Sequence, residues 1–107
     1  MAFTNASDVV LIINADTDIA HEAAGEILDS GARVVVTARI PAALTRMLLQ
    51  RSAEQVVAIA ADLGDARQRR KICERVLTTF GAPTWVVDGH TGEAVAIGSG
   101  AALTPAA

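Results

Sequence analysis

The sequence predicts an α/β fold: a three-layer, Rossmann-like, partial parallel sheet of four or five strands with helices on both faces. Short apolar runs alternate with helical patterns, beginning with Val9–Ile13 and then Ile19–Leu28. The chain is 51% hydrophobic but only 3% aromatic, so its core must be aliphatic, which suits a parallel sheet covered by helices. At 107 residues, we expect a single domain over residues 1–107, with its core at about residues 8–98 and a flexible tail at about 104–107.

Two strand–helix units are predicted in the first half of the chain. Val9–Ile13 has the length and β-branched character of a strand, and the helical pattern after it repeats at i, i+3, i+4 and i+7. Gly31 is placed to end that helix in a left-handed conformation. Arg33–Ala38 is a second strand, and Pro41 begins a second helix that runs to about Ser52.

The second half continues the alternation. Val56–Ala61 is a third strand, and Asp65 can cap a third helix from Ala66 to about Phe80. Thr84–Val87 is a fourth strand. Strands that alternate with helices in this way form right-handed crossovers and a parallel sheet.

The turn between the first strand and the first helix lies where nucleotide-binding units carry glycines. Asn14 tolerates positive φ and Ala20 is small enough to pack closely. Asp18, however, adds bulk and negative charge where a pyrophosphate would lie, and Asp16 adds a second charge. Two charges about 4 Å apart repel by about 4 kcal/mol at an effective dielectric constant of about 20. We therefore expect no cofactor, and we interpret these acids as stabilising the helix N-terminus.

Val9–Arg39 resembles the start of a short-chain dehydrogenase/reductase, a family that opens with a strand and a Thr-Gly-x-x-x-Gly-x-Gly turn. Ile13 falls at the threonine of that pattern. Asn14, Asp18 and Ala20 fall at its three glycines. The resemblance implies a Rossmann-type fold and assigns these positions to cofactor binding, in a degenerate form.

The resemblance extends in register over about residues 8–89 and implies roles for later positions. The segment "VVVTAR" is similar to the family's second strand, whose final arginine, here Arg39, selects the phosphate of NADPH. "AADLGD" resembles the segment after the third strand, where Asp62 and Leu63 would line the adenine pocket. "FGAPTWVVDG" resembles the "FG…VNNAG" region, with Asp88 at its first asparagine. The alternative to no cofactor is therefore NADP.

The family's catalytic pair is a tyrosine and a lysine four residues later. This chain has no tyrosine, and its one lysine, Lys71, falls in the third helix. Ala94–Ala102 resembles the fifth strand that carries the family's serine, which would be Ser99, a vestige without a base partner. The turn signals Asp88-Gly89 and Thr91-Gly92 instead favour a β-hairpin. Both arrangements of residues 84–98 stay open.

Polar residues that follow the strands gather at the carboxyl edge of such a sheet, where open α/β folds bind ligands. They are Asp16, Asp18, Asp62, Asp88 and His90. Their oxygens are suitable ligands for Mg²⁺ or Ca²⁺. The same residue types also cap helices and fill turns, which is the interpretation we favour, so we expect no metal site.

The third helix is rich in cations. Arg67, Lys71 and Arg75 share one of its faces. This face could dock an acidic partner or nucleic acid, although a solvated helix face is the simpler interpretation. The net charge of −3 and the pI of about 5.2 argue against a dedicated nucleic-acid binder.

Location and assembly are also predicted. The start of the chain lacks a signal-peptide pattern, and Val9–Ile13 is far shorter than the roughly 20 residues of a membrane helix. Cys73 is the only cysteine, so we expect a reducing, cytoplasmic location. With only one helix for the second face of the sheet, Val9–Ile13 should be half exposed. The chain should then form a homodimer or dock on a protein partner such as a full-length relative.

The sequence therefore predicts a degenerate, truncated short-chain dehydrogenase/reductase-like pseudoenzyme. We expect it to be non-catalytic and to act as an oligomerising or partner-binding subunit. The alternative is an NADP(H)-binding relative of that family whose catalytic residues come from a partner.

Overall fold

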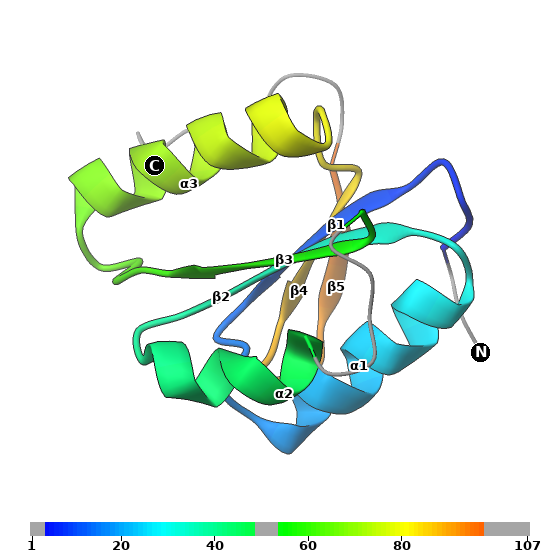
Figure 1. The fold of residues 1–107 in the computed structure, drawn as a ribbon, viewed down its shortest axis with the longest axis horizontal. Coiled ribbons are helices and arrows are strands. Elements are labelled where there is room, and N and C mark those ends of the chain that lie inside the picture. The colour runs from blue at the N-terminus through cyan, green and yellow to red at the C-terminus, as the bar shows by residue number, and fades with distance from the viewer. Residues whose placement is uncertain (1–3, 49–53, 98–107) are drawn as a thin grey trace.

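Over residues 4–48 and 54–97, the computed structural model consists of one five-stranded sheet between two layers of helices (Figure 1). The strands are β1 (Val9–Ile13), β2 (Arg33–Ala38), β3 (Val56–Ala60), β4 (Trp85–Asp88) and β5 (Ala94–Ala96). The helices are α1 (Asp18–Asp29), the 3-10 helix η1 (Pro41–Leu44), α2 (Thr45–Leu48) and α3 (Ala66–Thr79). The strand order is β3-β2-β1-β4-β5, and β1 to β4 are parallel. The predicted three-layer α/β fold is confirmed.

The ends of α1 and α3 follow from local chemistry. Thr17 caps α1, because its Oγ1 accepts a hydrogen bond from the Ala20 N–H at 3.0 Å. Gly31 lies just beyond α1 with φ of 92°, the left-handed conformation predicted for it. The carboxylate of Asp65 accepts from the Arg67 N–H at 2.9 Å and so caps α3, as predicted.

The second helix differs from its prediction. Instead of one helix from Pro41, the chain forms the short η1 and then the single turn of α2. Leu44, at the end of η1, is only 2% exposed and anchors the segment in the core. The expected continuation to Ser52 lies outside the described residues. None of the helices in the described part of the chain is long and apolar enough to cross a membrane.

Each face of the sheet has its own aliphatic core. α1 and α2 cover one face and α3 covers the other (Figure 1). On the α3 face, Ile72 and Val76 pack with Leu11 of β1 and its neighbours. Leu11 is 3% exposed, and residues 9–12 are all buried. The expectation that β1 would be half exposed is therefore wrong, because α3 alone is long enough to cover the central strands.

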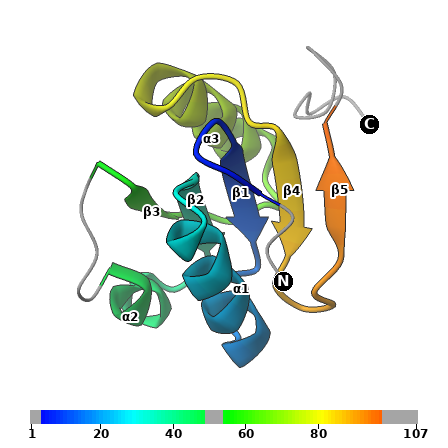
Figure 2. The ribbon, with the colours of Figure 1, turned by 90° about the vertical axis from the view of Figure 1, so that its right-hand side faces the viewer.

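The end of the described chain is a β-hairpin. β5 runs antiparallel to β4, with Trp85 opposite Ala96 and Val87 opposite Ala94. Figure 2 shows β5 beside β4 at one edge of the sheet, with β3 at the other. Of the two arrangements left open for residues 84–98, the hairpin is confirmed and the parallel strand is wrong. Ser99 and the tail predicted at 104–107 lie outside the described residues.

Thr37 in β2 provides a test of the core. Its side chain is fully buried, and its hydroxyl has no hydrogen-bond partner among the described residues. Because an unsatisfied buried hydroxyl costs about 1–3 kcal/mol, we expect Thr37→Val to raise the free energy of unfolding by about 1 kcal/mol, measured by urea denaturation.

Thr84→Val is the matched control. The Thr84 hydroxyl donates to Asp8 Oδ1 at 2.8 Å and accepts from the Val9 N–H at 3.2 Å. Its removal should lower the free energy of unfolding by about 1 kcal/mol. A loss of stability in both variants would show that the Thr37 hydroxyl is satisfied after all.

Candidate functional site at the carboxyl edge of the sheet

The turn after β1 has the backbone shape that a glycine would give it. Asn14 has φ of 51° and is the only non-glycine residue with positive φ in the described part of the chain. Asparagine adopts this left-handed conformation more readily than most residues. The sequence prediction that Asn14 would tolerate positive φ is confirmed, and the tight bend into α1 is retained.

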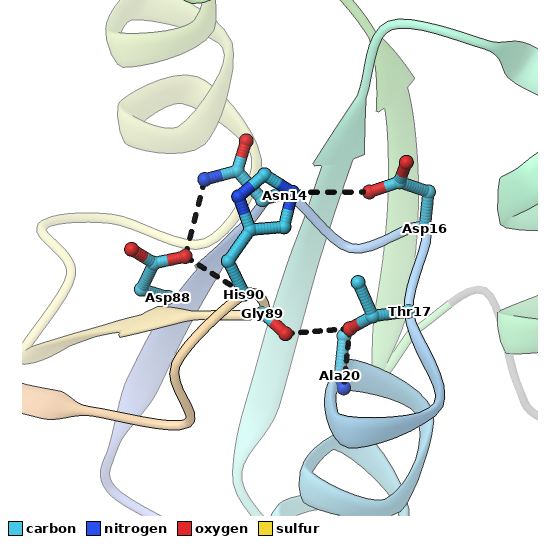
Figure 3. Close-up of polar contacts among 7 residues, drawn as sticks. All are labelled: Asn14, Asp16, Thr17, Ala20, Asp88, Gly89 and His90. Carbon is cyan, nitrogen blue, oxygen red and sulfur yellow. Dashed lines mark hydrogen bonds and ion pairs between the residues drawn. The ribbon is translucent and has the colours of Figure 1, made fainter.

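The β4–β5 turn lies directly against this bend (Figure 3). The Gly89 N–H donates to the Ile13 carbonyl at 2.8 Å, and the Thr17 hydroxyl donates to the Gly89 carbonyl at 2.6 Å. A Cβ atom at Gly89 would lie 2.1 Å from the Asn14 carbonyl oxygen. Only glycine can therefore occupy this position while the two turns remain in contact.

Asp88 joins the two turns through its carboxylate. Oδ1 accepts from the His90 backbone N–H at 2.9 Å and from Asn14 Nδ2 at 3.1 Å (Figure 3). These two hydrogen bonds, the backbone one first, lower the pKa of Asp88 because they favour the ionised form. The Asn14 side chain is thus held by a charged acceptor from the neighbouring strand.

The acids of the β1–α1 turn have cationic or basic neighbours. Arg46 Nη2 of α2 lies 2.8 Å from Asp18 Oδ1, and His90 Nε2 lies 4.0 Å from Asp16 Oδ1. The Arg46 and Asp18 side chains are 41% and 88% exposed, so their ion pair contributes only about 0–1 kcal/mol to stability. It nevertheless places positive charge beside the acid that we expected to repel a pyrophosphate. No motif or spacing pointed to Arg46, because it lies on another helix.

The other predicted nucleotide-binding positions follow the adjacent strands. Ala38 pairs with Ala60, so Arg39 and the residues after β3 emerge at the same edge of the sheet. Arg39 is exposed, whereas Asp62 and Leu63 are half-buried. The Asp62 carboxylate accepts from the Gly64 N–H at 2.8 Å. The fold thus brings the positions predicted for the pyrophosphate and those predicted for the adenosine half to one edge of the sheet.

The acidic residues do not form a metal centre in the described part of the chain. No group of three or more His, Cys, Asp or Glu side chains gathers closely enough there to hold an ion. Asp16 and Asp18 instead lie beside basic side chains, while Asp62 and Asp88 accept hydrogen bonds.

A protein-family model and several solved structures that resemble this chain are all short-chain dehydrogenases or reductases. A family model described as short chain dehydrogenase matches residues 8–89. A short chain dehydrogenase structure from Bacillus anthracis is 22% identical with a TM-score of 0.72, over 78% of this chain and 34% of that one. A glucose/ribitol dehydrogenase of the short-chain dehydrogenase/reductase type from Brucella melitensis is 24% identical with a TM-score of 0.74, over 81% and 37% of the two chains.

A third similar structure was solved with a nucleotide. It is a 3-ketoacyl-(acyl-carrier-protein) reductase from Brucella melitensis complexed with NADH, 26% identical with a TM-score of 0.69, over 75% of this chain and 33% of that one. This chain thus spans about a third of the length of these solved structures. A comparison with curated proteins finds no match.

These similarities correct one expectation from the sequence. The matched family and the reductase complexed with NADH indicate a nicotinamide cofactor-binding fold, so the expectation of no cofactor is wrong. The physical argument for it rested on uncompensated acids in the β1–α1 turn. In the folded chain, Arg46 lies against Asp18 and the Asn14 backbone keeps the glycine-like bend.

The contact between the two turns can be tested at Gly89. Because an added methyl group would overlap the Asn14 carbonyl, we expect Gly89→Ala to lower the free energy of unfolding by about 3 kcal/mol. Gly64→Ala is the control, since its Cβ would meet only the movable carboxylate of Asp62, at 3.1 Å. We expect this control to change stability by about 0.5 kcal/mol or less. Equal losses in the two variants, measured by thermal and urea unfolding, would show that the turns are not in close contact.

Proposed function

Because the chain belongs to the short-chain dehydrogenase family, we propose that it is a non-catalytic module of that fold which binds NADP(H). The observation that carries this proposal is the β1–α1 turn, where Asn14 has φ of 51° and Asp18 pairs with Arg46 at 2.8 Å. The bend needed for close approach of a pyrophosphate is retained, and one of its two acids is neutralised locally.

Three parts of this edge would each contact a different part of the nucleotide. The first turn of α1 offers backbone N–H groups and the positive end of a helix dipole to the pyrophosphate. Arg39, exposed after β2, would bind the 2′-phosphate, and Asp62 with Leu63 would border the adenine. When bound, NADP(H) supplies a hydride donor or acceptor. The fit is best at the adenosine half, where the family-matching residues are present.

The reaction itself is not assigned to these residues. In the family resemblance, catalysis requires a tyrosine with a lysine four residues later, and these 107 residues contain no tyrosine. Lys71 lies on the exposed side of α3, where it lines a groove beside β3. In this proposal, the chain holds the nucleotide and a partner supplies the catalytic residues.

A second copy of the chain is the partner that we propose. β5 is the outermost strand on its side of the described sheet, and its residues, Ala94–Ala96, carry no charge that would oppose edge pairing. Val95 is 61% exposed on this strand. Two β5 strands could pair antiparallel about a twofold axis, which buries the same surface on both copies.

Nucleotide binding is testable by isothermal titration with NADPH. We expect micromolar binding, and we expect Arg39→Ala to weaken it by about 10- to 100-fold, the usual effect of losing a charge-assisted hydrogen bond. NADH binding should change much less, because NADH lacks the 2′-phosphate. Arg33→Ala is the matched control, since Arg33 lies at the opposite end of β2.

Two results would contradict the proposal in different ways. No heat at millimolar NADPH would show that the acidic turn excludes the nucleotide. Oxidation of NADPH by the purified chain with a ketone substrate would show that it is catalytic without a partner.

Dimer formation is tested separately by sedimentation velocity. A charge at the centre of β5 should prevent edge pairing, so we expect Val95→Lys to convert a dimer into a monomer. Leu77→Lys is the control, because Leu77 is 55% exposed but lies on α3. A wild-type monomer at high concentration, or a dimer that survives Val95→Lys, would contradict pairing through β5.

A further inference from the structure

A groove lies between β3 and α3, away from the β1–α1 turn. Its volume is about 440 Å³. The lining residues are Ile59, Ala60, Ala61, Gln68, Lys71, Ile72 and Arg75. Ile72 and Ala61 are buried and form an apolar floor, whereas Lys71 and Arg75 are exposed at the rim. The groove therefore combines an apolar surface with two positive charges one helical turn apart.

Among the described residues, β3 beside the groove pairs with no strand on its outer side. β3 is the last strand on its side of the described sheet (Figure 2). The Gln55 carbonyl accepts a hydrogen bond from the Val34 N–H, and the Ala61 N–H donates to the Ala38 carbonyl. Both groups therefore point inward, toward β2. Because backbone groups alternate in direction along a strand, residues of the opposite parity, such as Ala58, direct their N–H and C=O groups outward. Such an edge is a template for one more strand.

The helix beside this edge, α3, is strongly positive. α3 carries five of the chain's nine lysines and arginines and only one acid, Glu74. The whole chain nevertheless has a net charge of −3, so positive charge is concentrated on this helix. A ligand that lies along β3 would meet Lys71 and Arg75 on the α3 side, which favours carboxylates at alternate positions.

We propose that the groove binds an extended acidic peptide segment of another protein, which adds to the sheet as a strand beside β3. Main-chain hydrogen bonds to the outer edge of β3 would hold the segment in register. Its carboxylates, at alternate positions, would face Lys71 and Arg75 on the α3 side of the sheet, and the side chains between them would point to the opposite face. The groove borders the proposed nucleotide edge, because its lining residue Gln68 accepts a hydrogen bond from the Asp62 N–H at 2.7 Å, but the peptide proposal does not depend on nucleotide binding.

The probe is the acetylated and amidated peptide Gly-Glu-Val-Glu-Thr-Glu-Val-Glu-Gly, titrated at low salt and followed by two-dimensional NMR. We expect saturable shifts in the amides of β3 and slower hydrogen exchange of the Ala58 N–H. The double variant Lys71→Glu/Arg75→Glu should weaken binding by about tenfold or more. Arg70→Glu is the matched control, because Arg70 is exposed on the same helix but does not line the groove.

A second variant separates strand addition from simple charge attraction. Ala58→Pro removes an outward N–H, a substitution that edge strands tolerate better than central ones, and it should weaken peptide binding by about fivefold or more with the charges intact. If this variant does not fold, slowed exchange of the Ala58 N–H in the wild-type complex decides the point instead.

Four results would overturn the proposal. Two concern charge: a peptide with Gln in place of Glu binds with equal affinity, or the affinity is unchanged in Lys71→Glu/Arg75→Glu. The other two concern strand addition: the hydrogen exchange of the Ala58 N–H does not slow, or the amides of β3 do not shift at millimolar peptide. Tighter binding of a single-stranded oligothymidylate than of the peptide would reassign the basic face of α3 to nucleic acid.

Discussion

The carboxyl edge of this fold depends on the close approach of Gly89 to the β1–α1 turn. No side chain separates the two backbones, so the β4–β5 turn can bond to Ile13 and Thr17 at the same time. The contact joins segments more than seventy residues apart and fixes the entrance to α1. The left-handed backbone of Asn14 is held in the same arrangement, through its side chain and Asp88.

This arrangement explains how an acidic turn is retained in a nucleotide-binding fold. Acids near a helix N-terminus stabilise the helix but oppose an anionic ligand. Here Asp18 is paired with Arg46 of α2, and Asp16 lies beside His90 of the β4–β5 turn. The local charge is therefore set by three elements together. The exposed position of Arg46 and Asp18 also leaves both accessible to solvent ions and ligands.

The two edges of the sheet differ in chemistry. β3 lies beside a basic helix, with Lys71 and Arg75 above an apolar floor. β5 is short and uncharged, and its Val95 is exposed. Each edge presents unpaired backbone groups in the described sheet, but only the β3 edge offers charge complementarity to an acidic ligand. One small domain thus has surfaces of different kinds on opposite sides, in addition to its carboxyl edge.

Elements that depend on nearby residues could be predicted from the sequence alone. The apolar run of β1, the left-handed Gly31 and the Asp65 cap act within a few residues, so periodicity and capping chemistry predict them. The family motifs assigned Arg39, Asp62 and Leu63 to nucleotide binding, and the pairing of β2 with β3 is what brings them to one edge. The burial of β1, the choice of a hairpin after β4 and the pairing of Asp18 with Arg46 became clear only from the folded chain. These depend on which distant surfaces meet, and sequence spacing does not encode that directly.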